Sequence, residues 1–216
     1  MNNEQKNQSI DVNSKKSDRN GLSGVLEGFV RTFRNLSFSL MLLPIFLLYI
    51  FCMGISLSPG MYLIQTTYRY VESYSLLIKS IALGFSLAGT FFIYGITLIF
   101  VVPFINKLLF LKVRPMKTSW FDLSVIPWYY HNALTYLVRY TFLDIITPTP
   151  LNKLFYQMMG MKIGKGSVIN TSNISDPCLI EIGDYVTIGG SATLIAHYGQ
   201  KGILILGKLI IEDHVT

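Results

Sequence analysis

Two long stretches of the chain are made of apolar and small residues and contain no charge. They cover residues 36–57 and residues 81–105. Each meets the requirement of about 20 apolar residues for a helix that crosses the hydrocarbon core of a bilayer. Pro44 lies inside the first stretch, where a membrane helix tolerates proline, and residues 58–60 (Ser-Pro-Gly) are expected to end it. The pattern predicts two transmembrane helices. The alternative, two buried helices of a soluble core, is disfavoured by the length of these stretches.

Polar and amphipathic segments precede the first uncharged stretch. Residues 1–22 are rich in Asn, Ser, Lys and Asp, which bury too little apolar surface to fold, so we expect a disordered tail. Val25, Phe29 and Phe33 then recur at helical spacing, which predicts an amphipathic helix at the membrane surface. Residues 23–117 are therefore interpreted as a membrane hairpin. Its second helix contains three glycines that allow close helix approach, namely Gly84, Gly89 and Gly95.

Basic residues lie at the outer ends of the two uncharged stretches. They are Arg31 and Arg34 before the first stretch, and Lys107, Lys112, Arg114 and Lys117 after the second. Lys and Arg collect on the cytoplasmic side of membrane proteins. We therefore expect a multi-pass protein of the inner (cytoplasmic) membrane with both termini in the cytoplasm.

Residues 118–160 are rich in aromatic side chains but are interrupted by charges and prolines. We expect interfacial helices and a linker here, with a helix in the cytoplasmic membrane interface. Its expected anchors are Trp120, Trp128, Tyr129 and Tyr130. A third membrane span over residues 125–146 is the alternative.

Branched aliphatic residues recur every six positions near the C-terminus. Ile182, Ile188 and Leu194 show this spacing, and six-residue windows that begin with an aliphatic residue start at positions 163, 182, 188, 205 and 211. A parallel β-helix built on hexapeptides has this signature, because each unit makes one short strand and one corner. The first and fifth residues of each unit are expected to point inward. We predict such a coil over residues 161–216; an ordinary sheet is the alternative.

The six-residue register is interrupted twice. The polar segment "NTSNISDP" intervenes between Ile169 and Ile180, and a second break follows His197. Loops that interrupt such a coil often carry the active site. Only two or three coils fit before Thr216, whereas a solenoid needs several stacked repeats and a cap. We therefore expect an incomplete coil, which belongs to a fragment or truncated product or is completed by a partner.

Two sequence segments carry a resemblance to a known family. "ITPTPLNKLFYQMMGMKIGKG" and "IEIGDYVTIGGSATLIAH" resemble the left-handed β-helix acyltransferases of the hexapeptide-repeat superfamily. They are most similar to the membrane-attached C-terminal region of polylysine-synthetase-type non-ribosomal peptide synthetases. The resemblance extends from about residue 118 to the end of the chain. It implies an N-terminal α-helical membrane region followed by an incomplete left-handed parallel β-helix.

The resemblance also implies an activity. Enzymes of this superfamily transfer an acyl group, commonly acetyl, from coenzyme A to a hydroxyl or amine. The acceptor must lose a proton as it attacks the thioester, and a histidine with a pKa near neutrality suits that role. His197, at the end of a repeat, is the predicted catalytic base. His131 is expected to pack at the headgroup level and His214 to lie on the outside of the coil.

Further residues are expected to bind the acyl-coenzyme A co-substrate. Backbone amides near Gly189 and Gly190, or Gly199, could stabilise the oxyanion of the thioester. Lys201 and Lys208 could meet the phosphates on the outside of the coil. No metal is expected, since the acidic residues of this region, Asp176 among them, are interpreted as corner residues.

Composition narrows the range of partners. Hydrophobic residues make up 51% of the chain and charged residues only 14%, which favours membrane lipid as a partner. The net charge of +6 lies on residues that flank the apolar segments, and no nucleic-acid-binding module is present, so nucleic acid is not an expected partner. Cys52 and Cys178 are predicted to be free thiols.

Two functional hypotheses follow. The first is a membrane-anchored acyltransferase that acts on a sugar, lipid or peptide-like acceptor. The second is a non-catalytic membrane module or a truncated remnant of a synthetase. A homotrimer is plausible, because in such coils the active sites form between neighbouring coils.

Overall fold

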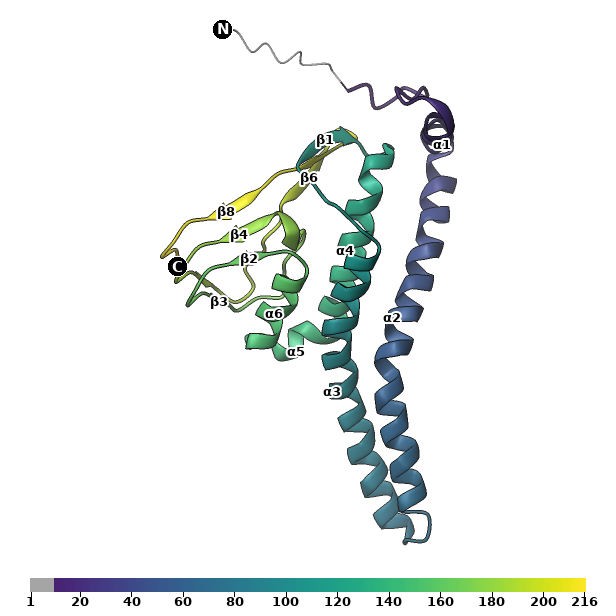
Figure 1. Ribbon diagram of the computed structural model, residues 1–216, viewed down its shortest axis with the longest axis vertical. Coiled ribbons are helices and arrows are strands. Elements are labelled where there is room, and N and C mark those ends of the chain that lie inside the picture. The colour runs from purple at the N-terminus through teal and green to yellow at the C-terminus, as the bar shows by residue number, and fades with distance from the viewer. Residues whose placement is uncertain (1–9) are drawn as a thin grey trace.

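The computed structural model describes residues 10–216 and consists of a long helical hairpin with a smaller strand-containing part at its side (Figure 1). Residues 1–9 of the predicted tail lie outside the described residues. Residues 10–20 contain no helix or strand, but the Arg34 Nη2 atom donates a hydrogen bond of 2.8 Å to the Val12 carbonyl. The first helix, α1, covers Gly21–Thr32.

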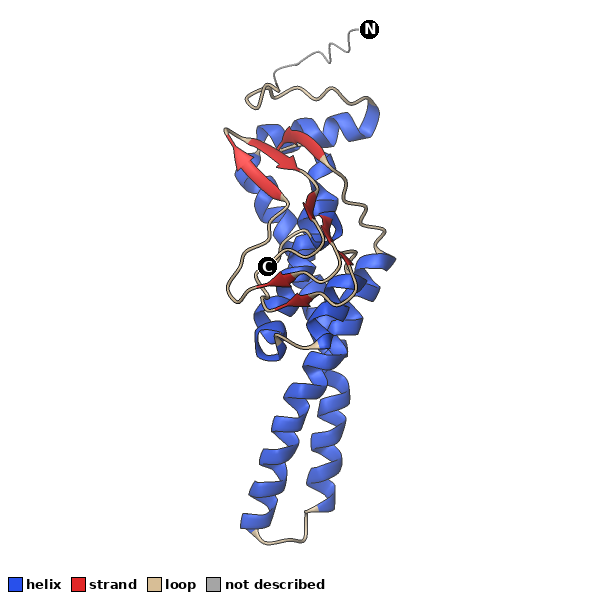
Figure 2. Ribbon diagram, turned by 90° about the vertical axis from the view of Figure 1, so that its left-hand side faces the viewer, coloured by secondary structure: helices blue, strands red, loops and turns tan. Residues whose placement is uncertain are grey.

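The hairpin consists of α2 (Arg34–Tyr70) and α3 (Leu76–Leu108). At 1.5 Å per residue these helices are about 55 and 50 Å long. By length and composition both could cross a membrane. The predicted end of the first span at residues 58–60 is wrong, because α2 continues through Pro59 to Tyr70. The lower end of the hairpin projects well beyond all other elements (Figure 2).

Small residues bring the two long helices together. An added Cβ on Gly60 would lie 2.3 Å from the Thr90 side chain, whose hydroxyl donates to the Gly60 carbonyl at 3.0 Å. Ser86 donates to the Thr67 hydroxyl at 2.7 Å in the same contact. Of the three predicted glycines, only Gly95 is required by a close neighbour, the Phe142 ring. Gly84 faces open space and Gly89 has only an ordinary contact.

Short helices connect the hairpin to the strands. They are the 3-10 turn η1 (Leu123–Val125), α4 (Ile126–Val138), the π-helical segment η2 (Arg139–Leu143), α5 (Asp144–Ile146) and α6 (Pro150–Met158). α4 packs against both α2 and α3. Trp128, which we predicted as an anchor at the membrane interface, is instead buried within the protein, and His131 is buried as well. The face of α4 that contains these two residues therefore packs into the core of the protein.

Parallel strand pairs stack at a regular interval in the C-terminal part. β2 (Lys162–Ile163) pairs with β4 (Ile180–Ile182), and β3 (Val168–Ile169) pairs with β5 (Thr187–Ile188). In both pairs the partners are nineteen positions apart, Lys162 with Glu181 and Val168 with Thr187. β4 also pairs in parallel with β8 (Leu209–Ile211). The short 3-10 turn η3 (Pro177–Leu179) directly precedes β4.

Four of the side chains that were predicted to point inward are buried, namely Ser167, Ile182, Val186 and Ile188. Val215, the fifth residue of the last six-residue window, is instead 42% exposed. Ser167 also hydrogen-bonds across the stack, since its hydroxyl donates to the Gly183 carbonyl at 2.7 Å and accepts from the Val186 N–H at 3.0 Å. Apolar burial and this polar contact hold consecutive repeats in register.

An antiparallel hairpin interrupts the parallel stack. β6 (His197–Gln200) pairs with β7 (Ile203–Leu206), and β1 (Met116–Ser119) adds to the other edge of β7. The predicted six-residue window at position 205 is therefore wrong, because Ile205 belongs to an antiparallel strand. The alternating sequence of residues 203–206 suits such a strand, which buries Leu204 and Leu206 on one face.

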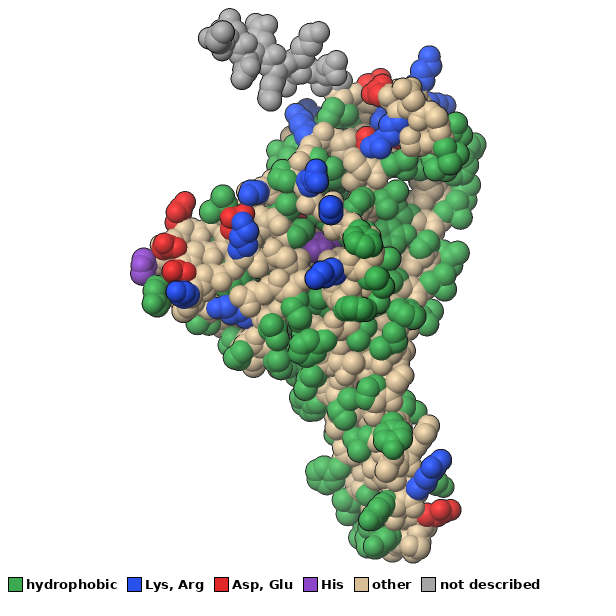
Figure 3. All heavy atoms as spheres, in the orientation of Figure 1, with side chains coloured by type: hydrophobic (Ala, Val, Ile, Leu, Met, Phe, Trp, Pro, Cys, Tyr) green, Lys and Arg blue, Asp and Glu red, His purple; other side chains and the backbone are tan. Residues whose placement is uncertain are grey.

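Surface chemistry differs between the two parts. Apolar side chains cover the hairpin along almost its whole length, and charged side chains gather at its tip, near α1 and on the strand-containing part (Figure 3). α2 has no charged residue between Arg34 and Arg69, a distance of about 50 Å along the helix. This surface is suited to lipid over at least the thickness of a hydrocarbon core.

Candidate active site

The two interruptions of the six-residue register lie next to each other in space. Ile174, in the first interruption, forms a parallel bridge with Leu194, just before the second. The Ser175 N–H donates to the Leu194 carbonyl at 2.9 Å. Asp176, two residues after Ile174, meets His197, three residues after Leu194, with 2.6 Å between Oδ2 and Nδ1.

Asp176 is fully buried, and four groups donate to its carboxylate. Oδ1 accepts from Trp128 Nε1 at 2.7 Å and from Asn132 Nδ2 at 2.6 Å. Oδ2 accepts from the Ala196 N–H at 3.1 Å and from His197. Asn132 also accepts from the Asp176 N–H at 3.0 Å, so α4 holds both the backbone and the side chain of this residue.

The Asp176 backbone is strained. Its φ of 59° lies in the left-handed region, and the next residue, Pro177, disfavours such a conformation in its predecessor. Non-glycine residues in this region cost on the order of 1 kcal/mol or more. The contacts with α4 offset this cost and aim the carboxylate at His197.

The hydrogen bonds set the charge of the carboxylate. Burial alone would raise the pKa of Asp176, but hydrogen bonds from His197, Asn132 and Trp128, together with the positive charge that His197 can carry, hold that pKa below its usual range. Asp176 is therefore ionised at neutral pH and can only accept hydrogen bonds. His197 Nδ1 must then carry a proton, so the neutral form of this imidazole has its lone pair on Nε2.

The Trp128 ring fixes the imidazole plane. Its centroid lies 5.0 Å from that of His197 at an interplanar angle of 71°, an edge-to-face contact. The His197 side chain keeps 21% of its surface exposed, whereas Asp176 has none. An oriented imidazole with a free Nε2, backed by a buried carboxylate, is the arrangement of a general base.

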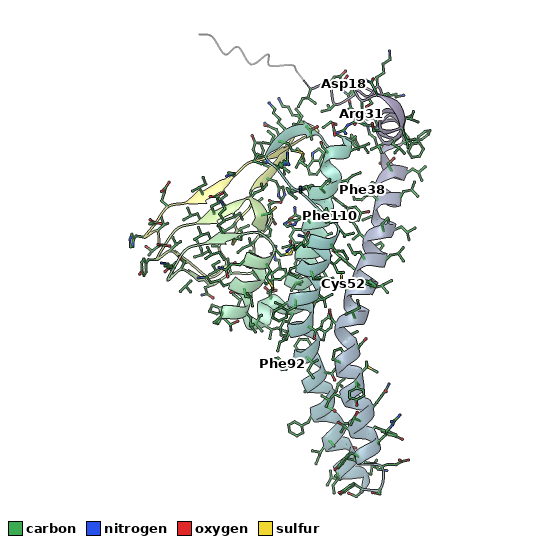
Figure 4. The ribbon with its side chains drawn as sticks, viewed as in Figure 1. Asp18, Arg31, Phe38, Cys52, Phe92 and Phe110 are labelled. Atoms are coloured by element: carbon green, nitrogen blue, oxygen red, sulfur yellow. The ribbon has the colours of Figure 1, made fainter. Side chains whose placement is uncertain are left out.

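A groove of about 270 Å³ adjoins the imidazole. We call it the α2–α4 groove. Its lining includes Leu42, Ile45 and Phe46 of α2, Tyr129 and Ala133 of α4, and His197. In Figure 4 the labelled Phe38 lies above this part of α2 and the labelled Cys52 lies below it.

One hydrogen bond and one ring contact join the two helical walls of the groove. Phe38 packs edge-to-face against Tyr129, with 6.1 Å between ring centroids. The Tyr49 hydroxyl donates to the Ala133 carbonyl at 2.7 Å. The groove is therefore a built feature of the contact between α2 and α4.

The other predicted site residues are dispersed. Gly189 and Gly190 occupy the exposed turn after β5. Lys201 lies in the turn between β6 and β7, at the opposite end of this hairpin from His197. Lys208 forms an ion pair of 3.0 Å with Glu181 on the outside of the strands.

The two remaining histidines take no part in the site. His131 is buried, contrary to a position at the headgroup level, and its Nδ1 lies 3.0 Å from Asn106 Oδ1. His214 is exposed and stacks on Tyr185, with 5.4 Å between ring centroids. Neither has a carboxylate partner in the described part of the chain.

The sequence interpretation missed three residues of the site. Asp176 was interpreted as a corner residue, and Trp128 was interpreted as a membrane anchor. Asn132 carried no signal of its own. The polar segment that interrupts the repeats was the one available indication, because it contains Asp176.

Residues 10–216 hold no group of three or more His, Cys, Asp or Glu side chains that could bind a metal ion. Comparison of the chain with protein-family models, with curated proteins and with solved structures finds no match.

Proposed function

We propose that this protein is a membrane-anchored acyltransferase of the hexapeptide-repeat type. It transfers an acyl group, in the simplest case acetyl, from coenzyme A to a hydroxyl or amine. The observation that carries the proposal is the 2.6 Å contact between His197 and the buried, ionised Asp176. The carboxylate orients the imidazole and would stabilise the imidazolium that forms when His197 accepts a proton.

The proposal includes a fold assignment. The parallel pairs nineteen positions apart support a coil of three six-residue units with one extra residue, as expected for the left-handed β-helix of this superfamily. The longer interval between β4 and β8 is explained by the inserted hairpin β6–β7. This insertion presents His197 at its base.

His197 acts as base and then as acid in this reaction. Nε2 accepts the proton of the acceptor hydroxyl or amine while the acceptor oxygen or nitrogen attacks the thioester carbon. Asp176 stabilises the imidazolium that forms. As the carbon–sulfur bond breaks, the same proton passes from Nε2 to the departing thiolate, so that His197 returns to its starting state.

The remaining assignments concern substrate and membrane. Amides near Gly189 and Gly190 are candidates to stabilise the oxyanion, and Lys201 and Lys208 are candidates for the phosphates of coenzyme A. The hairpin α2–α3 is proposed to anchor the protein in the cytoplasmic membrane with both termini in the cytoplasm, on the basis of the basic flanks of the two helices. A homotrimer is the proposed assembly, because in such coils the active sites form between neighbouring coils.

The test measures release of free coenzyme A from acetyl-coenzyme A by the full chain in lipid nanodiscs, with a membrane extract as the source of acceptor. We expect His197→Gln to lower the rate by about 10²–10⁴-fold, the usual contribution of general base catalysis. The matched control is His214→Gln, which alters an exposed histidine outside the site. Equal, non-zero rates in His197→Gln and the unaltered protein would refute His197 as the base, and no release of coenzyme A by the unaltered protein would refute the proposed function.

A further inference from the structure

The α2–α4 groove lies between the proposed base and the lipid-facing surface of the hairpin. Leu42, Ile45 and Phe46 of α2 line the groove, while the neighbouring Leu43 and Leu47 are 57% and 58% exposed. Phe46 belongs to both surfaces, since it lines the groove and is 55% exposed. The groove is therefore continuous with the uncharged outer face of α2.

Few polar groups in the groove are available to a ligand. The Tyr49 hydroxyl is committed to the Ala133 carbonyl, and the Tyr136 hydroxyl is paired with Ser175 at 2.7 Å. Asn132 is committed to Asp176. Two polar groups of the lining remain, His197 Nε2 and the Tyr129 hydroxyl, for which the described residues show no hydrogen-bond partner; the rest of the passage is apolar.

This pattern discriminates between classes of acceptor. A sugar or a peptide in the groove would leave several polar groups without hydrogen-bond partners, which is costly away from water. An alkyl chain needs none. At about 270 Å³ the groove is slightly smaller than the usual ligand pocket of about 300–1,000 Å³, so it can hold one polar head and the first part of a chain.

We propose that the acceptor is a membrane amphiphile with one hydroxyl or amine at the end of an apolar chain. Its polar end lies at His197 Nε2, and its chain passes between Leu42 and Ala133 to the outer face of α2. This inference rests on the proposed function, because it identifies the substrate of the same site. It excludes water-soluble sugars and peptides as acceptors.

The experiment uses the full chain in phosphatidylcholine nanodiscs and a long-chain primary alcohol that carries a photoactivatable diazirine next to its hydroxyl. After irradiation, the labelled residues are mapped by mass spectrometry. We expect labels on α2 and α4 around Leu42 and Ala133, and competition by excess unlabelled long-chain alcohol but not by glycerol.

Two groove-filling variants and one matched control test the assignment. Leu42→Trp fills the groove from α2, and Ala133→Leu fills it from α4. Leu43→Trp places the same indole one residue away, on the exposed face. Groove labelling should fall by about tenfold or more in the two filling variants, as expected when several methylene groups lose their site, and should persist in the control.

The outcomes separate the two proposals. Equal labelling in Leu42→Trp, Ala133→Leu and Leu43→Trp would overturn the lipid site. Acyl transfer to a water-soluble acceptor that Leu42→Trp leaves unchanged would overturn it too, and the proposed function would stand. Labelling confined to the groove without any coenzyme A release in the presence of the long-chain alcohol would overturn the acyltransferase function and retain the lipid site.

Discussion

Asp176→Asn is the substitution whose effect the structure defines most closely. The carboxylate accepts two hydrogen bonds on each oxygen, at 2.7 and 2.6 Å on Oδ1 and at 3.1 and 2.6 Å on Oδ2. A carboxamide of the same shape has only one oxygen. Its NH₂ group must replace one of the two acceptors and face two donors.

The orientation of the carboxamide follows from its partners. Trp128 Nε1 can only donate, so the new oxygen must remain on its side. The NH₂ group then faces the Ala196 N–H, which loses its acceptor, and His197 Nδ1, which has to become an acceptor itself. The imidazole proton moves to Nε2, and the base loses the lone pair that the reaction needs.

Both stability and activity should fall. A buried N–H without a partner costs about 1–3 kcal/mol, and the two bonds retained on the oxygen lose about 0.5–1.5 kcal/mol each when the acceptor becomes neutral. Part of this loss in unfolding free energy is offset, because the variant no longer has to bury a charge. We expect a net loss of about 2–4 kcal/mol in unfolding free energy and a 10²–10⁴-fold loss of coenzyme A release.

The chain contains its own probe for the stability measurement. It has two tryptophans, Trp120 and Trp128, whose rings lie 5.5 Å apart beside the site. Their fluorescence reports unfolding of this region in detergent during a denaturant titration. Glu212→Gln, which neutralises an exposed carboxylate, is the matched control. Unfolding free energy within about 0.5 kcal/mol of the unaltered protein, the range typical of surface substitutions, would refute the role assigned to Asp176.

The stability difference should also depend on pH. The folded-state pKa of Asp176 is depressed, so its contribution is present above the ordinary carboxyl value of about 3.9 and is lost as the pH falls toward the folded pKa. The gap between the unaltered protein and Asp176→Asn should therefore narrow below about pH 4.

Three further predictions concern His131, Gly60 and Cys178. Burial lowers the pKa of His131 to about 4. The free energy of unfolding should therefore fall by about 3 kcal/mol as the pH drops from about 6.5 to about 4, because the unfolded chain takes up a proton that the folded chain does not. In denaturant titrations, His131→Leu should remove this dependence on pH. Gly60→Ala should destabilise the hairpin by about 1–3 kcal/mol, because the added Cβ would lie 2.3 Å from the Thr90 side chain. Gly54→Ala is the control, since its Cβ would meet no atom within 4 Å. Thermal unfolding in micelles compares the two variants. Burial, with a smaller contribution from the nearby Asp176 charge, raises the pKa of Cys178 to about 12, so iodoacetamide should modify this thiol at neutral pH only after denaturation, as mass spectrometry can verify.

Each of these predictions has a distinct contrary outcome. An unchanged pH slope in His131→Leu would assign the titration to another group, and His214→Gln is the exposed control. Equal unfolding temperatures for the two glycine variants would mean that the helices are not in contact at Gly60. Rapid alkylation of Cys178 in the folded protein would place this thiol at the surface.

The sequence anticipated those features that depend on local pattern. Two long uncharged runs predicted two long apolar helices, and the structure has both, followed by a small strand-containing region. The burial of Ile182, Val186 and Ile188 follows from the six-residue spacing. The prediction failed where a proline was interpreted by its behaviour in soluble proteins, because α2 passes through Pro59.

The interpretation of Trp128 shows a limit of a different kind. Large aromatic rings with one polar atom suit a membrane interface and equally suit a buried site where that atom has a partner. Which environment applies depends on whether an acceptor is nearby, and that acceptor, Asp176, is 48 positions away. No local pattern contains this information.

The pairing of Asp176 with His197 was nevertheless close to what the sequence contained. Both residues lie in interruptions of the same six-residue pattern, and the coil that this pattern predicts would bring equivalent positions of successive turns side by side. Two interruptions about one turn apart, here with 21 positions between Asp176 and His197, are therefore expected to adjoin.

The sequence could not show that α4 supplies the remaining donors from outside the strand-containing part. α4 also forms a wall of the groove together with α2, so the segment that orients the base is the one that connects it to the membrane hairpin. Without this helix the strand-containing part would lack both the partners of the buried carboxylate and the apolar passage, which is why we propose that the helical hairpin and the candidate site act as one unit.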